Sequence, residues 1–227
     1  MRSLQPGRIA LFATATAGCL VLGGHVLMAG DGTRYDHRGA ERAERLAQAA
    51  ARRFEDGRGL TPCDMPAREL MEAAQAKLVV LGESRANPIV IVAPTFSEVK
   101  VVAFEPDLIR TYRFPGSSGA AVPSSTWFAG PAQKVGEMSM SPQVSQEIVA
   151  PLARHVRYAM TTPMFGMDGV TFYFGYGASD CAFTWSPGGR GPARLMTDLV
   201  EEASSRSPSV AKLRSLAAAI DAADESL

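Results

Sequence analysis

Histidine, cysteine and carboxylate side chains carry most acid–base, nucleophilic and metal chemistry in proteins. Only His155 lies well inside the chain, where it stands between Arg154 and Arg157. With two of the three histidines near the N-terminus and the cysteines far apart, no spacing resembles a zinc site. We therefore expect neither a metal nor a cofactor.

The serine and glycine motifs match the known catalytic templates only in part. Gly82-Glu83-Ser84 could form a nucleophile elbow, but Ala86 stands where the second glycine is required. Ser97 and Lys100 have the S-x-x-K spacing, yet they lead into a predicted strand that would turn them to opposite faces. The glycine-rich segment 188–191 lacks the lysine of a phosphate-binding loop and fits a turn that enters a helix.

The most distinctive stretch is 167–187, which is rich in aromatic residues. Phe172, Phe174 and Tyr176 alternate with Thr171, Tyr173 and Gly175, so one face of the predicted strand is aromatic. These aromatics either fill a core or form an exposed binding platform. For the second interpretation, the candidate binding residues are Asp168, Tyr176, Asp180 and Trp185, together with Trp127 from a long loop.

The chain opens with a segment typical of export. Arg2 and Arg8 precede a run, 9–30, that contains no charged residue apart from a titratable His25. Such a run is a cleaved signal peptide or an uncleaved membrane anchor, and a lipid-modified Cys19 is a third reading. We expect residues 31–227 to form a single domain in the periplasm or outside the cell. If segment 9–30 is not cleaved, we expect it to be the part of the chain that contacts the membrane.

Export makes a disulfide the favoured state of the two remaining cysteines, Cys63 and Cys181. Two separately buried free thiols are the alternative, and sequence spacing does not exclude it.

Hydrophobic periodicity predicts an α+β fold, in which an antiparallel sheet is covered by helices and preceded by the N-terminal signal or anchor helix. The sheet combines a meander with a C-terminal hairpin, because the connections between the predicted strands are short. We expect the helix that starts at Pro142 to bend at Pro151. The predicted helices are 34–56, 66–77, one from Ser141, 192–203 and 208–223; the strands are 78–82, 88–93, 99–104, 108–114, 170–176 and 181–185; a long loop spans 115–136.

Composition narrows the class of function. The chain has 46% hydrophobic and 20% charged residues, a formal net charge of zero, and no dense Lys/Arg cluster, which argues against nucleic-acid binding. We expect an exported, non-catalytic domain that binds a protein, a peptide or an envelope polymer. The alternative is a periplasmic or secreted hydrolase that uses carboxylates such as Glu83, Asp168 or Asp180 as acid and base.

Overall fold

The computed structural model describes residues 59–83, 86–117, 124–159, 169–177, 179–187 and 191–225. The leader, the predicted helix 34–56 and Asp168 lie outside the described residues. In chain order the elements are β1 (Thr61–Pro62), α2 (Met65–Val80), β2 (Ile89–Pro94), β3 (Val99–Phe104), β4 (Leu108–Phe114), the 3-10 helix η1 (Ser125–Phe128), β5 (Gln133–Ser139), α3 (Pro142–Arg157), β6 (Val170–Tyr176), β7 (Asp180–Trp185), α4 (Pro192–Ala203) and α5 (Val210–Glu225).

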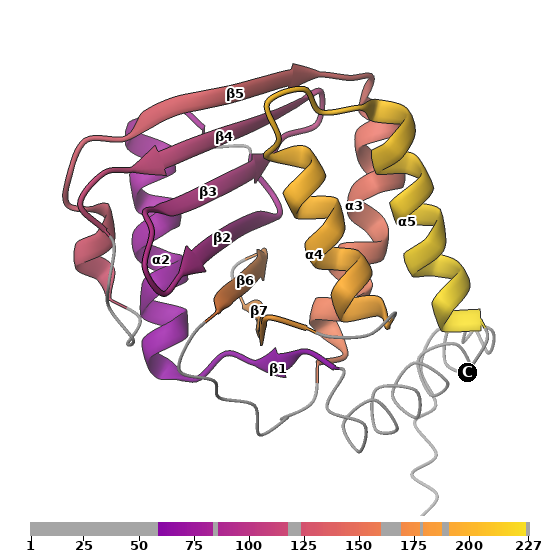
Figure 1. Ribbon diagram of the computed structural model, residues 1–227, viewed down its shortest axis with the longest axis horizontal. Helices are drawn as coiled ribbons and strands as arrows, with labels where there is room; N and C mark the ends of the chain where they lie inside the picture. Colours follow the sequence, from indigo (N-terminus) through magenta and orange to yellow (C-terminus); the bar gives the residue numbers. More distant parts are fainter. Residues whose placement is uncertain are drawn as a thin grey trace, which may run out of the picture. The chain divides into compact units, whose positions relative to one another are not determined.

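All seven strands join one sheet in the order β1-β7-β6-β2-β3-β4-β5, and every neighbouring pair is antiparallel. The predicted meander and the predicted C-terminal hairpin thus belong to the same sheet, and the α+β class is confirmed. The hairpin β6–β7 is inserted between β1 and β2, so its sequence neighbours are not its spatial neighbours (Figure 1).

The sheet is buried on both faces, because its strands send alternate side chains into two separate cores. On one face, Ile91 and Val101 pack with α2 and η1. On the other face, Val90 and Val102 pack with α3, α4 and α5 (Figure 1). This two-sided burial explains the nearly continuous apolar runs of β2 and β3.

The predicted strand 78–82 is wrong, because α2 continues to Val80. Leu70, Ala74 and Leu78 are all buried and repeat every four residues, so the buried helical face continues to Leu78, and the β-branched Val79 and Val80 that complete the helix are exposed. The helix begins where Asp64 accepts a hydrogen bond from the Ala67 amide at 3.0 Å.

The predicted long loop also ends earlier than expected, since 133–136 belong to β5. Most β5 residues are exposed, so the strand lacks the alternation of apolar and polar residues that would have revealed it. Helix α3 contains Pro151 and still runs from Pro142 to Arg157 as one element, capped by Ser141.

Candidate functional site

The disulfide between Cys63 and Cys181 is present, as the sequence predicted. The two Cα atoms are 5.3 Å apart, within the usual range for such a bond. Cys63 lies between β1 and α2, and its amide also donates to the Cys181 carbonyl at 3.0 Å. The bond therefore fixes the start of α2 against β7, next to the turn of the β6–β7 hairpin.

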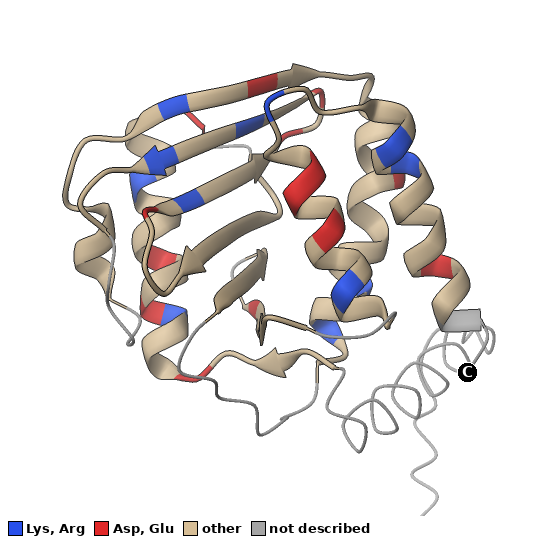
Figure 2. Ribbon diagram, in the orientation of Figure 1, with Lys and Arg blue, Asp and Glu red and all other residues tan. Residues whose placement is uncertain are grey.

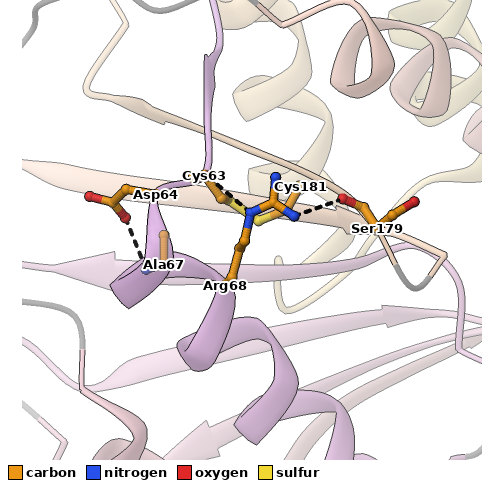
Figure 3. Close-up of a disulfide and its surroundings, with 6 residues drawn as sticks. All are labelled: Cys63, Asp64, Ala67, Arg68, Ser179 and Cys181. Atoms are coloured by element: carbon orange, nitrogen blue, oxygen red, sulfur yellow. Dashed lines mark hydrogen bonds between the residues drawn. A yellow bond between two sulfur atoms is a disulfide. The ribbon is translucent and has the colours of Figure 1, made fainter. Parts of the chain in front are cut away.

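Arg68 lies across this junction (Figure 3). Its Nε donates to the Cys63 carbonyl at 3.2 Å, and its Nη1 donates to the Ser179 carbonyl at 3.4 Å. The guanidinium thus connects the first turn of α2 to the hairpin turn, on the surface above the disulfide.

A small depression of about 50 Å³ opens beside Arg68, between α2 and the hairpin. Helix α2 approaches β6 closely here, and a Cβ added at Gly175 would overlap the Met71 Cε. Gly177 forms the turn with a φ of +67°. The depression is lined by Arg68, Met71, Glu72 and Gln75 from α2 and by Gly175, Gly177, Ser179, Asp180 and Cys181 from the hairpin.

The structure brings only some of the sequence-predicted binding residues together. Tyr176 and Asp180 are cross-strand partners at the hairpin turn, and Asp180 also lines the depression. Trp185 pairs with Thr171 at the opposite end of the hairpin, about 17 Å away at 3.3 Å per residue. Trp127 is buried in η1, in the core that contains α2.

The other aromatics of the hairpin fill the two cores. Phe172 and Phe174 lie in the core under α3, α4 and α5, whereas Tyr173 lies in the core under α2. Tyr173 and Phe183 are in contact, with ring centroids 5.7 Å apart. The described aromatics therefore do not form one continuous platform.

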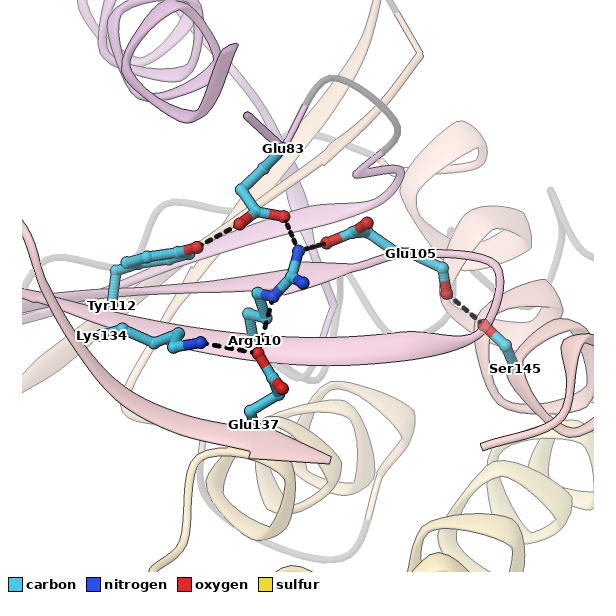
Figure 4. A network of polar contacts seen from close by, with 7 residues as sticks. All are labelled: Glu83, Glu105, Arg110, Tyr112, Lys134, Glu137 and Ser145. Atoms are coloured by element: carbon cyan, nitrogen blue, oxygen red, sulfur yellow. Dashed lines mark hydrogen bonds and ion pairs between the residues drawn. The ribbon is translucent and has the colours of Figure 1, made fainter. Parts of the chain in front are cut away.

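A second polar cluster centres on Arg110 of β4 and contains three glutamates (Figure 4). Arg110 Nη1 contacts Glu83 and lies 2.7 Å from Glu105 Oε1, while its Nε donates to Glu137 Oε2 at 2.9 Å. The Tyr112 hydroxyl donates to the other oxygen of Glu83. We call Glu83, Glu105, Arg110, Tyr112 and Glu137 the Arg110 cluster.

The Arg110 cluster draws on segments that are far apart in the sequence. Glu83 follows α2, Glu105 lies in the β3–β4 turn, and Glu137 lies on β5. The backbone carbonyl of Glu105 also accepts a hydrogen bond from Ser145 of α3 at 2.7 Å. One arginine thus holds together a helix end, a turn and two strands.

Burial and the neighbouring Glu83 together raise the pKa of Glu105 to about 7, against the opposing effect of Arg110. Burial also raises the pKa of Glu83, but hydrogen bonds with Glu105, Tyr112 and Arg110 outweigh it, so that this pKa lies below its ordinary value. Burial and the hydrogen bond to Glu83 raise the pKa of Tyr112. Two carboxyls with separated pKa values are a common feature of acid–base sites, although here both contact the same arginine.

Of the Arg110 cluster, sequence reasoning selected only Glu83. A signal for the rest existed in β4, where Arg110, Tyr112 and Phe114 occupy alternate positions on one face. Tyr112 and Phe114 are core residues, so an arginine in the same phase indicates a partly buried cation that requires acidic partners.

Comparison with protein-family models, curated proteins and solved structures gives no match. Within the described ranges, no group of three or more His, Cys, Asp or Glu side chains is arranged so that it could hold a metal ion. Nor does any helix in those ranges have the length and apolar character needed to cross a bilayer.

Proposed function

We propose that this chain is an extracytoplasmic binding domain without catalytic activity, and that its ligand contacts the depression between α2 and the β6–β7 hairpin. The observation that carries the proposal is the construction of this depression. Charged side chains of both signs, Arg68, Glu72 and Asp180, surround about 50 Å³ of space, next to backbone that a disulfide holds in place.

The size of the depression favours binding over catalysis. Sites that enclose a small-molecule substrate usually measure about 300–1,000 Å³. A space of about 50 Å³ instead accepts one projecting group of a larger ligand. Its charged and polar lining suits a polar group of a protein, a peptide or an envelope polymer, the ligand classes expected from the sequence.

Export is the second part of the proposal. A disulfide is compatible with an oxidising compartment outside the cytoplasm. We place the domain in the periplasm or outside the cell, with 9–30 as its signal peptide or inner-membrane anchor.

A hydrolase remains the second candidate, because Glu83 and Glu105 have pKa values shifted in opposite directions. Their contacts with Arg110 favour a structural role, since the cation compensates the charge that a general acid or base would need to exchange. A hydrolase would release soluble fragments from isolated cell envelopes, and Glu83→Gln would abolish that release.

Site-specific photo-crosslinking in the native envelope tests the binding proposal. A photoreactive residue at Gln75, which lines the depression, should give a discrete adduct with the ligand. The matched control is Gln146, an exposed glutamine on α3. The adduct should disappear when Arg68→Glu is added. Equal labelling from both positions, or none from Gln75, would refute this site.

A further inference from the structure

Strand β5 forms one edge of the sheet. Among the described residues it pairs only with β4, and Figure 1 shows no described element beyond it. An unpaired edge of seven residues presents a row of backbone donors and acceptors that another strand can use.

The ladder between β4 and β5 determines which backbone groups of β5 point outward. The Met140 amide donates to the Asp107 carbonyl at 2.9 Å, which makes these two residues a hydrogen-bonded pair. In an antiparallel ladder such pairs alternate, so Met138 and Gly136 also direct their backbone groups toward β4. Glu137, which lies between them, directs its N–H and C=O away from the sheet.

An irregularity in β5 makes the backbone N–H and C=O of Lys134 point outward, like those of Glu137. The register pairs Thr111 with Gly136 but Tyr112 with Lys134, which leaves Val135 as an extra residue. Counting on from the irregularity, Gln133 directs its backbone groups toward β4 and Lys134 directs them outward.

The same irregularity places Lys134 and Glu137 on one face, although residues three apart normally lie on opposite faces of a strand. The Lys134 ammonium and the Glu137 carboxylate are 2.8 Å apart. Figure 2 shows this acidic and this basic position along the otherwise uncharged β5. The edge therefore carries one cation and one anion on the same face, both with outward-facing backbone.

We propose that β5 pairs antiparallel with β5 of a second copy of this chain, so that Lys134 lies opposite Glu137 of the partner subunit. A twofold axis perpendicular to the sheet produces this contact twice and keeps each face continuous across the interface. Gln133 then lies opposite the partner's Met138. On β4, Gln133 is opposite Arg113 and Met138 is opposite Ile109. Arg113 and Ile109 are four residues apart and so lie on one face of β4, which places Gln133 and Met138 on one face of β5 as well.

The charges select this register against its neighbours. A shift in one direction places Lys134 opposite the partner's Lys134, and the opposite shift places Glu137 opposite the partner's Glu137. In both shifted registers the opposed side chains still lie on the same face, and their backbone groups still point toward the partner strand. Like charges directly opposite each other, however, destabilise a strand pair. Only the proposed register joins opposite charges.

Backbone hydrogen bonds and two exposed ion pairs form a small interface, so we expect a dissociation constant in the micromolar range. Sedimentation equilibrium of the full-length protein measures it. Lys134→Glu should weaken the dimer about tenfold, because two attractions become two repulsions. Lys100→Glu makes the same change of charge on β3, two strands from the edge, and should leave the constant unchanged.

Zero-length crosslinking of an equal mixture of light- and heavy-nitrogen-labelled chains tests the register. The amide between Lys134 and Glu137 should appear in peptides that combine both labels, in addition to the same-label peptides from the contact within one chain. A protein that stays monomeric would overturn the proposal. A dimer that Lys134→Glu does not weaken, as expected for association through 9–30, would also overturn it, as would crosslinks without mixed labels.

Discussion

At the scale of the residue, Arg110 has an unusual position for a cation. It lies on the strand face that carries Tyr112 and Phe114, and its side chain is 23% exposed. Its three glutamate partners range from Glu83, which is 6% exposed, to Glu137, which is 40% exposed. The contact with Glu83 is the one that solvent screens least.

Arg110→Ala should therefore lower the free energy of unfolding by about 3 kcal/mol, because Glu83 would keep a buried charge without its cation. Arg113→Ala is the matched control on the same strand. Arg113 is 44% exposed and pairs with an exposed Glu98, so its loss should cost less than about 1 kcal/mol. Urea unfolding of both variants measures the difference, and equal losses would contradict a special role for Arg110.

The pKa of Glu105 gives stability a pH dependence. This pKa is raised to about 7 in the folded protein, whereas the unfolded chain has an ordinary carboxyl near 4.5. The folded state therefore binds the proton more tightly than the unfolded chain does. The stabilisation that protonated Glu105 gives to the folded state is complete below about pH 4.5 and is lost as the pH rises through about 7. Glu83, whose pKa is lowered, acts in the opposite direction. Its ionised form stabilises the folded state, and this stabilisation is lost as the pH falls into the acidic range.

Glu105→Gln should flatten the dependence of stability on pH between about 5 and 7, because the amide does not titrate. Thermal unfolding followed across this range would measure the slope for both proteins. A wild-type slope that persists unchanged in Glu105→Gln would assign the titration to another group.

At the scale of the element, α2 is held against the hairpin at three points. The disulfide lies just before its first turn, Arg68 donates to the Ser179 carbonyl, and Met71 contacts Gly175. All three points border the depression, so they determine its width.

Removing the disulfide through Cys63→Ala and Cys181→Ala should cost about 2–4 kcal/mol, because the bond closes a long loop across 118 residues of sequence. Denaturant unfolding under oxidising and reducing conditions would measure this loss in the wild type. Reductant should leave the double variant unaffected. Labelling of both thiols in the unreduced, denatured wild type would show that the bond is absent.

Gly175→Ala should cost at most about 1 kcal/mol, because the new methyl group overlaps only the flexible end of the Met71 side chain, which can shift toward the depression. Adding Met71→Ala removes that overlap, so the double variant should lose less than the sum of the two single losses. Gly136→Ala is the control, since its added Cβ meets only Thr111, at 3.6 Å. Additive losses would place the strain elsewhere.

Local patterns predicted the hairpin, the meander strands and most helices, because each depends on periodicity within a few residues. They failed at 78–82, where α2 overrides a β-branched run, and at β5, whose exposed edge lacks alternation. Cys63 and Cys181 were paired correctly because they are the only two cysteines outside the predicted leader. The Arg110 cluster assembles from four separate segments, so the alternation in β4 could indicate a partly buried Arg110 but could not identify its partners.

At the scale of the whole molecule, the proposed export has a direct test. A reporter enzyme that is active only outside the cytoplasm, fused after Leu227, should be active in cells that express the full-length fusion. A fusion without residues 1–30 should be inactive, because it lacks the signal or anchor. Activity that is restricted to a cytoplasmic reporter would exclude the proposed location.

The insertion of β6–β7 between β1 and β2 also affects the order in which the chain can fold. Strand β2 is synthesised early, but one of its two neighbours, β6, follows about 80 residues later. Until then, the growing chain has an open edge at what becomes the middle of the sheet. Such long-range pairing is typical of slow folding. The complete sheet and the disulfide can form only once β7 has followed. This order suits the proposed export, in which the chain crosses the membrane before it folds.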